Sequence, residues 1–451
     1  MEKIELLRRF GLFDRSVPRY TSYPPANHFV NDAGRKHQNP WLKAIPEGTG
    51  VSIYVHIPFC KRLCWFCACR TQGTSTLRPV EAYVHTLLAE VEAAKKALKN
   101  KVKLQRLHLG GGTPTLLTPA LMTELVTKIR DAFEPMKSFE FSVEVDPTEA
   151  SDELLETLAD LGLTRASIGV QDFAPKVQAA IGRKQTIAQT QHVVQVLRQQ
   201  GVTSINFDVL YGLPHQTRDS FLRTLNTTLK MSPDRLAIYG YAHVPWVSKR
   251  QVLISEADLP GSEERFHLAE IAHRFFTNAG YRAIGIDHFA RPTDGLALAK
   301  DAGTLRRNFQ GYTDDDSPVL LGFGASAISK FPQGYAQNAV ATSAYQDRVR
   351  TEGFAAHRGF SMTRRDQLHA MIIERLLCDF SFSRIDVCAA FPDLKPEIDA
   401  IFLDLCAQYT DVLAVSSDRL TLRDGFEPLA RIIAKSVDVF RAENQSHSKA
   451  I

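Results

Sequence analysis

Four cysteines lie close together near the start of this chain, in the segment His56-Ile-Pro-Phe-Cys60-Lys-Arg-Leu-Cys64-Trp-Phe-Cys67-Ala-Cys69. They are too crowded to pair as several disulfides, so metal ligation is the better explanation. Three thiolates on one loop can hold three corners of a 4Fe–4S cluster and leave the fourth iron open to a substrate. A structural zinc or a purely electron-transferring cluster is the alternative, although structural zinc sites usually need a second separated knuckle, which this chain lacks.

Other residues that could bind a small molecule follow the ends of predicted strands. The run Gly110-Gly-Gly-Thr-Pro-Thr115 would let the backbone approach a ligand closely and expose N–H groups. Glu144 offers a carboxylate for an ammonium group or for ribose hydroxyls. Gln171, Arg183 and Asp208 add an amide, a carboxylate-binding fork and another hydroxyl acceptor. Any one of these alone is more often a helix cap or a surface group; their shared position beyond strand ends favours a common site.

Six successive strand–helix units are predicted to position these residues. The hydrophobic patterns indicate strands at 51–57, 104–109, 139–145, 165–170, 204–210 and 235–241. Helices are predicted at 79–98, 119–133, 151–161, 187–199, 217–231 and 262–279. Such alternation indicates a parallel sheet, open or curled into a barrel, with the chemistry at the carboxyl ends of the strands.

The chain is long enough for a catalytic domain and smaller flanking parts. We expect an N-terminal extension over residues 1–47 that covers the active site, a catalytic barrel over 48–350 and a smaller, mainly helical domain over 351–451. Cys378, Cys388 and Cys406 of that last part lie among apolar residues and are interpreted as buried small hydrophobes.

Composition and charge exclude several classes of protein. The hydrophobic and charged fractions are 44% and 23%, which is ordinary for a globular protein. The net charge of +4 suits an acidic small molecule and does not demand nucleic acid or a membrane surface. No apolar run is long enough to span a bilayer, and the charged start is unlike a secretion signal. We therefore expect a cytoplasmic protein with no membrane span and no nucleic-acid partner.

The C-x3-C-x2-C spacing after the first barrel strand resembles the signature of the radical S-adenosylmethionine (SAM) superfamily, and Phe66 before the third cysteine is also typical of it. The resemblance implies a cluster bound by Cys60, Cys64 and Cys67, whose open iron chelates SAM. One electron then breaks a C–S bond and releases a 5′-deoxyadenosyl radical. The same resemblance favours Cys69 as a nearby thiol that is not a ligand, and the fold as a partial (β/α)6 barrel.

Segments on both sides of the cysteines resemble the oxygen-independent coproporphyrinogen III oxidase family. They run from about Pro18 to about Arg431 and comprise Pro18-Arg-Tyr-Thr-Ser-Tyr-Pro24, Tyr54-Val-His-Ile-Pro-Phe-Cys60, Gly169-Val-Gln-Asp-Phe173, Asp208-Val-Leu-Tyr-Gly-Leu-Pro214, Tyr241-Ala-His-Val-Pro245, Asp287-His-Phe-Ala-Arg-Pro292, Asn308-Phe-Gln-Gly-Tyr-Thr313 and Gly324-Ala-Ser-Ala-Ile-Ser329. This resemblance implies oxidative decarboxylation of two propionates of coproporphyrinogen III to vinyl groups, with protoporphyrinogen IX as the product. It also implies an electron donor such as flavodoxin or ferredoxin, and a separate, unknown electron acceptor.

The family binds two SAM molecules, and motif position carries its binding residues onto this chain. The first molecule would be held by Tyr54, Gly111, Glu144 and Ile328. The second would be held by Phe66, Gly112, Thr113, Gln171, Arg183, Asp208 and Ala242. Tyr54 and Cys69 are the candidate catalytic residues. The arginines that could meet the four substrate carboxylates are Arg19, Arg291, Arg306 and Arg307.

Two other functions remain open at this level. One is a non-enzymatic haem chaperone with the same barrel and cluster, which would usually lack the Pro18–Pro24 leader and the fourth cysteine. The other is a radical methyltransferase that opens haem anaerobically. Ala68 departs from the glycine found in several relatives, but it leaves all four thiols in place. Nothing in the chain resembles a coiled coil, and a monomer is expected.

Overall fold

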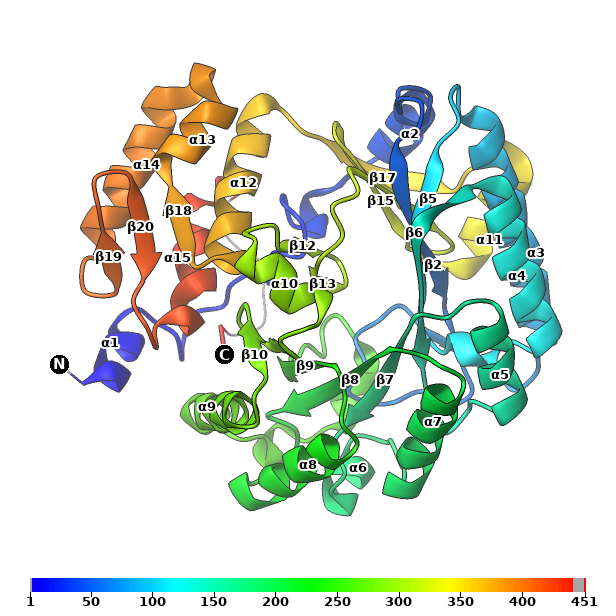
Figure 1. Cartoon of the computed structure of the whole chain (residues 1–451), viewed down its shortest axis with the longest axis horizontal. Coiled ribbons are helices and arrows are strands. Elements are labelled where there is room, and N and C mark those ends of the chain that lie inside the picture. The colour runs from blue at the N-terminus through cyan, green and yellow to red at the C-terminus, as the bar shows by residue number, and fades with distance from the viewer. Residues whose placement is uncertain (1, 441–449) are drawn as a thin grey trace.

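A computed structural model describes residues 2–440, 450 and 451, and its centre is one sheet of 13 strands. Seven neighbouring strands of this sheet run parallel. In spatial order they are β14 (Val319–Phe323), β2 (Gly50–Ile57), β5 (Lys103–Gly111), β6 (Glu134–Val145), β7 (Arg165–Gln171), β8 (Ser204–Tyr211) and β9 (Arg235–Gly240). Figure 1 shows these strands as a curved sheet that does not close.

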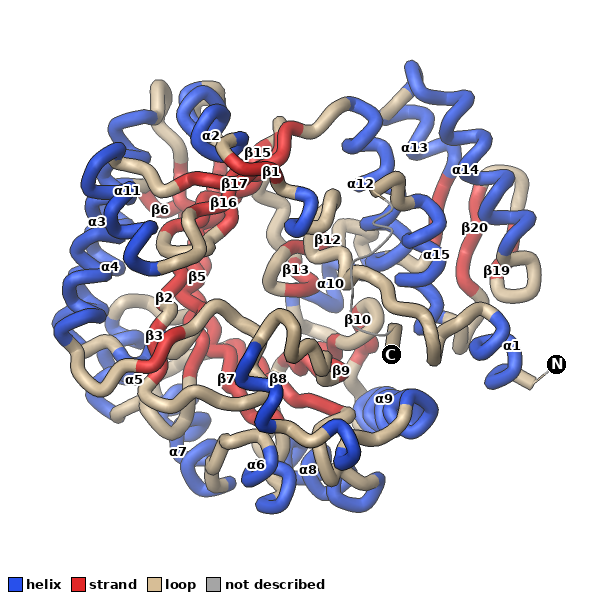
Figure 2. Tube along the Cα trace, turned by 180° about the vertical axis from the view of Figure 1, so that it is seen from behind, coloured by secondary structure: helices blue, strands red, loops and turns tan. Residues whose placement is uncertain are grey.

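Helices connect the successive parallel strands and cover the outside of the curve (Figures 1 and 2). They are α3 (Arg78–Ala97), α4 (Pro119–Ala132), α5 (Asp152–Asp160), α6 (Pro175–Ala180), α7 (Ile187–Gln199), α8 (Arg218–Lys230) and α9 (Ser262–Asn278). Only α6 was not predicted. Thr118, Ser151, Thr186 and Thr217 cap four of them by accepting a backbone N–H. The predicted partial (β/α)6 barrel of the α/β class is therefore confirmed.

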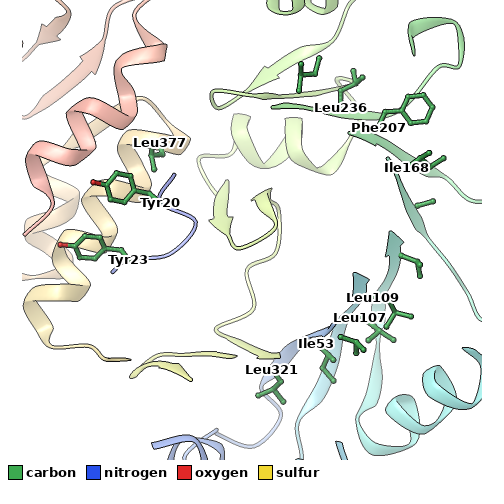
Figure 3. Close-up of a cluster of buried hydrophobic side chains, with 14 of the residues drawn as sticks. Tyr20, Tyr23, Ile53, Leu107, Leu109, Ile168, Phe207, Leu236, Leu321 and Leu377 are labelled. Carbon is green, nitrogen blue, oxygen red and sulfur yellow. The ribbon is translucent and has the colours of Figure 1, made fainter. Parts of the chain in front are cut away.

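Alternation along each strand separates the core from the interior of the curve. In β7, Ala166, Ile168 and Val170 are buried, whereas the residues between them are only half-buried. Strand β8 repeats the pattern, with Phe207 among its buried members. Figure 3 shows Ile168 and Phe207 with the apolar side chains of neighbouring strands. Because side chains alternate between the two faces of a strand, the helices bury the apolar set and the polar set faces inward.

Antiparallel strands extend the sheet at both edges. Beyond β14 lie β15 (Ile328–Phe331), β16 (Gly334–Asn338), β17 (Ala356–Ser361) and β1 (Val30–Asn31). Beyond β9 lie β11 (His288–Ala290) and β10 (Arg282–Ile284). The sheet thus continues past residue 350, where we expected the catalytic barrel to end, because the β16–β17 pairing places 356–361 beside the barrel strands.

The last part of the chain forms a smaller unit beside the open side of the barrel (Figures 1 and 2). Its helices are α12 (Arg364–Cys378), α13 (Arg384–Ala390), α14 (Lys395–Gln408) and α15 (Ala430–Val437). A small sheet of β18 (Ser381–Ser383), β20 (Arg419–Leu422) and β19 (Leu413–Val415) accompanies them. Residues 441–449 of the expected C-terminal domain lie outside the described residues.

The N-terminal extension runs from this unit back to the barrel. Helix α1 (Lys3–Arg9) is followed by Phe10, whose ring lies 5.3 Å from that of Tyr409. The Tyr20 hydroxyl donates to Asp438 at 2.9 Å, and β1 then pairs with β17. The remaining elements are α2 (Ala33–Lys43), α10 (Gly295–Asp301), α11 (Thr342–Glu352), β3 (Phe59–Cys60), β4 (Gln72–Gly73), β12 (Arg306–Asn308) and β13 (Gly311–Thr313). In the described part of the chain, no helix is long and apolar enough to cross a membrane.

A buried carboxylate fixes the turn between β14 and β15. Glu90 on α3 is fully buried and accepts from the Gly324 N–H at 2.9 Å, the Tyr345 hydroxyl at 2.7 Å and the Asn338 amide at 2.7 Å. Burial raises the pKa of Glu90 to about 7, and the hydrogen bonds only partly oppose it. This turn leads into Ile328, one of the predicted SAM-binding residues.

Glu90→Gln is expected to change how stability depends on pH. The folded-state pKa of Glu90 is raised above its ordinary value of 4.5. Its contribution to the free energy of unfolding is therefore fully present below pH 4.5 and is lost as pH rises through about 7. The difference in unfolding free energy between the wild type and Glu90→Gln should therefore decrease from pH 5 to pH 8, by at most about 1.4 kcal/mol per pH unit. Denaturant titrations at both pH values measure it; a constant difference would contradict the burial argument.

Candidate active site

A cavity of about 810 Å³ lies inside the curved sheet. Such a volume is near the upper end of the range for small-molecule sites, about 300–1,000 Å³. The inward-facing polar side chains of the parallel strands contribute much of its lining. These include Tyr54, His56, His108, Ser142, Glu144, Ser167, Asn206 and Asp208. The alternation of polar and apolar residues within each strand, which the sequence displays, is the signal that could have identified this whole set.

The cysteine loop begins at β3, directly after the strand β2 that contributes Tyr54 and His56 to the cavity. Cys60 and Cys64 are buried, with 9% and 8% exposure, and Cys67 is half-buried. Cys69 is exposed, lines the cavity and is hydrogen-bonded to Cys67. The loop therefore places three shielded thiols beside one that faces the cavity.

Three residues of the segment after β9 hold this loop in place, and the sequence analysis did not identify them. The Ser248 hydroxyl donates to the Cys67 carbonyl at 2.9 Å. The Gln251 amide is fully buried and donates to the carbonyl oxygens of Phe66 at 2.7 Å and Ala242 at 3.2 Å. Arg250 donates to the Thr71 hydroxyl at 2.7 Å. Ser248, Arg250 and Gln251 are positioning residues, because they fix the loop backbone and leave the thiols free.

The glycine motif is required by close packing against the same loop. A Cβ on Gly112 would lie 2.6 Å from the Phe59 carbonyl oxygen, and a Cβ on Gly111 would lie 2.5 Å from the His56 ring. The N–H groups are not open to a ligand as expected, since those of Gly112 and Thr113 donate at 2.8 Å to the carbonyls of Ile57 and Phe59. These hydrogen bonds attach the motif to the backbone between β2 and the cysteines, so its role here includes positioning the loop.

Gly112→Ala is expected to displace the Phe59–Cys60 backbone, because the contacting atoms are main-chain atoms that cannot rotate away. Purified Gly112→Ala should retain markedly less cluster iron after reconstitution than the wild type. Gly261→Ala is a matched control, because nothing lies within 4 Å of its added Cβ. Equal iron contents in the two variants would show that this close contact does not position the cysteines.

A chain of hydrogen bonds orients the aromatic residues beside the glycines. The Arg70 carbonyl can only accept, so His56 donates to it from Nε2 at 2.9 Å. Its Nδ1 then accepts from the Tyr54 hydroxyl at 2.9 Å. Burial lowers the pKa of His56 and favours this neutral form. The ring of Tyr54 stacks on that of His108, with centroids 5.8 Å apart.

Glu144 is held as a carboxylate at the end of β6. It accepts from the Gly111 N–H at 2.9 Å, and His108 Nε2 lies 3.5 Å from its other oxygen. Burial would raise its pKa, but the hydrogen bonds and the charge of His108 outweigh burial and hold the pKa below the ordinary value. In Asp208, by contrast, burial raises the pKa to about 6, although Asn206 and Ser167 donate to it at 2.9 and 3.2 Å. The cavity thus contains two carboxyl groups with different proton affinities.

Arg183 connects the strand ends to the cysteine loop. Its guanidinium donates to Asp146 at 3.1 Å and to the Gly169 carbonyl at 2.9 Å. One nitrogen of the same fork lies 3.6 Å from the Cys64 sulfur. Arg183 is buried and already engaged by these groups, so its position supports the loop.

The predicted ligand-binding residues fall into two groups in space. The four assigned to the first SAM molecule all line the cavity: Tyr54, Gly111, Glu144 and Ile328. Of those assigned to the second, Asp208 lines the cavity. The others lie at strand ends or around the cysteine loop, namely Phe66, Gly112, Thr113, Gln171, Arg183 and Ala242. Gln171, which ends β7, has a positive φ of 64°.

Two of the four predicted arginines line the cavity. They are Arg19 and Arg307. Arg307 lies over the Tyr312 ring at 4.4 Å and donates from one nitrogen to the Arg19 carbonyl. Its Nε and Nη1 are buried without a hydrogen-bond partner among the described residues. Buried unsatisfied donors on a cation favour an anionic ligand.

The other two arginines are not part of the main cavity lining. Arg291 lies over the Tyr281 ring, at 5.3 Å from its centroid. Arg306 forms an ion pair with Glu374 at 2.9 Å. Both Arg306 and Arg307 line a smaller adjoining cavity, but only Arg307 also lines the large one.

A further acidic group, Asp287, which the sequence analysis did not assign, faces the cavity. His288 Nδ1 donates to Asp287 at 2.7 Å, and the other ring nitrogen lies 3.1 Å from the Tyr239 hydroxyl. Although burial opposes ionisation, this hydrogen bond and the positive charges of His288, Arg307 and Arg19 lower the pKa of Asp287 to about 2. Asp287 is therefore a carboxylate next to the unsatisfied arginine.

Ion pairs join the parallel strands at their amino-terminal ends. Arg106 and Arg235 lie 2.6 and 3.0 Å from the two carboxylate oxygens of Asp314, and Arg165 lies 3.1 Å from Glu140. Four of these residues line the cavity, namely Arg106, Glu140, Arg165 and Arg235, and Asp314 pairs with two of them. Because each of these three arginines has a carboxylate partner, this end of the cavity stabilises the barrel and does not offer a free site for an anion.

The donor set of the cysteine loop fits an iron–sulfur cluster. A cluster needs several thiolates, and hydrogen bonds to its sulfurs tune its potential. Here the side chains of Arg183 and Thr113 hydrogen-bond to Cys64 and Cys60. In the described residues, no three His, Cys, Asp or Glu side chains gather closely enough for one metal ion.

Comparisons with known proteins agree with this geometry. The model of the radical SAM superfamily matches residues 54–228. The oxygen-independent coproporphyrinogen III oxidase of Paracoccus denitrificans is 47% identical over 451 residues, covering 100% of both chains. That of Escherichia coli K12 is 38% identical, covering 89% of this chain and 86% of its own. The solved structure titled coproporphyrinogen III oxidase (HemN) from Escherichia coli has a TM-score of 0.90 and 35% identity, covering 95% of this chain and 100% of that one.

The barrel, the cysteine loop and these matches place the chain in the radical SAM superfamily. The enzymes of this class use a 4Fe–4S cluster together with SAM. Within it, the chain belongs to the oxygen-independent coproporphyrinogen III oxidase family. These matches support the enzymatic interpretation over the haem chaperone and the haem-opening methyltransferase.

Proposed function

We propose that this chain converts coproporphyrinogen III to protoporphyrinogen IX without oxygen, by oxidative decarboxylation of two propionate side chains. The observation that carries the proposal is Arg307, a half-buried arginine that lines a large cavity next to the cysteine loop and has two nitrogens without a hydrogen-bond partner among the described residues. An anionic substrate with several carboxylates fits this cavity better than a neutral one. The near-full-length similarity to relatives of that name supports the same choice.

The substrate chemistry balances as follows. Removal of a hydrogen atom from the β-carbon of a propionate leaves a radical next to the carboxyl-bearing carbon. Loss of CO2 and one electron then gives a vinyl group, and an external acceptor must take that electron. When bound, the cluster and SAM supply the 5′-deoxyadenosyl radical that removes the hydrogen atom.

The chain's own residues bind and orient the reactants. We assign propionate binding to Arg307, supported by Arg19, whose carbonyl fixes the Arg307 side chain. The Asp287 carboxylate, oriented by His288, can accept hydrogen bonds from pyrrole N–H groups. Because porphyrinogens present carboxylates and pyrrole N–H donors together, an adjacent arginine and aspartate match both groups.

Cys60, Cys64 and Cys67 would hold the cluster, and Cys69 would remain a free thiol facing the cavity. The proposal includes two SAM molecules, as the family resemblance implies. It is supported by the positions of the candidate residues: the four assigned to the first molecule line the cavity, whereas those assigned to the second, Asp208 excepted, lie at strand ends or around the cysteine loop. The Glu144 carboxylate is placed to accept from the methionyl ammonium of one molecule, and Asp208 to accept from a ribose hydroxyl.

The proposal extends to partners and location. An electron donor such as flavodoxin or ferredoxin would reduce the cluster, and a separate acceptor would take the electron that decarboxylation releases. We propose a monomer in the cytoplasm, consistent with the absence, in the part of the chain described, of any helix able to cross a membrane.

Anaerobic incubation tests this function directly. Reconstituted protein, SAM, dithionite, an electron acceptor and coproporphyrinogen III should yield protoporphyrinogen IX and 5′-deoxyadenosine. Omission of SAM is the control and should abolish both products. Haem binding without vinyl formation would instead support the chaperone, and methyl transfer to haem would support the methyltransferase.

A further inference from the structure

An exposed apolar surface lies next to the cysteine loop and has no role in the site described so far. It is the segment 246–253, in which four side chains are largely exposed: Trp246 at 55%, Val247 at 67%, Val252 at 69% and Leu253 at 57%. Four large apolar side chains this exposed within eight residues of one another are unusual for a surface with no partner. We call this segment the apolar strip.

The apolar strip is tied to the cysteine loop by direct hydrogen bonds. Between its exposed residues, Ser248 and Gln251 turn inward and donate to the carbonyl oxygens of Cys67 and Phe66, at 2.9 and 2.7 Å. A partner that covers the strip would therefore lie one residue layer from the backbone that carries the thiols. Electron tunnelling slows steeply with distance, so this is a favourable place for a reductant to dock.

The charged residues within the apolar strip and the cysteine loop are all basic. Lys249 is exposed and Arg250 half-buried within it, and the cysteine loop adds Lys61, Arg62 and Arg70. Neither 60–78 nor 244–255 contains an aspartate or glutamate. Lys61 is partly neutralised by Glu149 at 2.7 Å. The next carboxylates after the strip, Glu256 and Asp258, lie 3.4 and 3.5 Å from histidine nitrogens.

We propose that the apolar strip, with the basic residues beside it, is the docking surface for an acidic one-electron donor protein that reduces the cluster. Apolar side chains that lie beside mainly basic residues favour a partner with an apolar centre and acidic residues around it. The inference rests on the proposed function, because it assumes that the cysteines carry a reducible cluster. A second copy of this basic surface would repel itself, which disfavours self-association here.

The test compares two reductants on the same variants. Val252→Glu and Lys249→Glu each place negative charge on the strip, and Leu403→Glu makes the same change at a 65% exposed site on α14. Cluster reduction by flavodoxin hydroquinone, followed anaerobically by stopped-flow absorbance, should slow by about tenfold or more in the first two variants only. Reduction by dithionite, and product formation with dithionite, should stay within about twofold of wild type in all three, since a small reductant needs no docking surface.

Salt provides a second measurement that needs no variant. Wild-type reduction by flavodoxin should slow markedly between about 50 mM and about 500 mM NaCl, while reduction by dithionite should change little.

Equal slowing with both reductants in the strip variants would overturn the proposal, because the substitutions would then act on the cluster loop itself. An unchanged flavodoxin rate would overturn it too, by placing docking elsewhere. Wild type that is reduced normally by flavodoxin but forms no protoporphyrinogen would refute the proposed function and leave the docking surface standing.

Discussion

Replacing Cys64 with serine is expected to abolish cluster assembly and, with it, all product formation. Cys64 is buried, and the Arg183 guanidinium lies 3.6 Å from its sulfur, so a thiolate bound to the cluster at this position would be shielded from water and hydrogen-bonded to a cation. A serine hydroxyl does not ionise at neutral pH and is a poor substitute for that thiolate. After anaerobic reconstitution, Cys64→Ser should lack most of the cluster iron and the visible absorption of the cluster, and should release no detectable 5′-deoxyadenosine.

Cys69→Ser is the discriminating partner of that experiment. Cys69 is exposed to the cavity and hydrogen-bonded to Cys67, so we expect its replacement to leave the cluster assembled. Cys406→Ser, on α14 and outside the site, controls for the loss of any thiol. If cluster iron falls equally in Cys69→Ser and Cys64→Ser, Cys69 is a fourth ligand, and the open iron that radical chemistry requires is lost.

Arg307→Gln is expected to give the second large effect. The glutamine amide keeps a polar group but removes the charge that the two unpaired nitrogens offer to a carboxylate. We expect kcat/KM for coproporphyrinogen to fall by about 100-fold, or about 2.7 kcal/mol, which lies within the range for removing one member of a buried charge pair. Initial-rate measurements with saturating SAM provide the value.

Arg306→Gln is the matched control, because it makes the same change one residue away. Arg306 pairs with Glu374 and is not part of the main cavity lining, so kcat/KM should stay within about threefold of wild type. The KM for SAM should be unaffected in both variants. A loss of activity of similar size in both variants would mean that β12 is perturbed as a whole and that Arg307 has no special role.

Much of the fold could be predicted because its signals are local. Strand β7 reads Arg-Ala-Ser-Ile-Gly-Val-Gln, and this alternation both forms a strand and divides it into a core face and a cavity face. The helix α7 begins at Ile187, directly after its N-cap Thr186, whose capping box with Gln189 is visible in the sequence. The cysteine spacing is similarly local, since three ligands of one cluster can come from a single loop.

The parts that were missed depend on contacts between distant segments. The buried Gln251 reaches Phe66 across 185 positions of the chain, and nothing in either local pattern predicts that meeting. The continuation of the sheet past residue 350 could not be predicted for the same reason, because β17 joins the sheet only by pairing with β16 and β1.

The adjacent arginines Arg306 and Arg307 show the difference between what the sequence determines and what only the tertiary structure determines. The family resemblance implied an acidic substrate, and the sequence offered arginines to bind it, because residue type alone decides charge. Which arginine stays unpaired depends on the side of β12 it occupies and on what packs there: Glu374 meets Arg306, whereas Arg307 lies over Tyr312 at the cavity. The sequence therefore determined which residue types and short spacings could carry the chemistry. Whether each of these side chains is free to bind a ligand was decided by its neighbours in the tertiary structure, since pairing and burial arise only on folding.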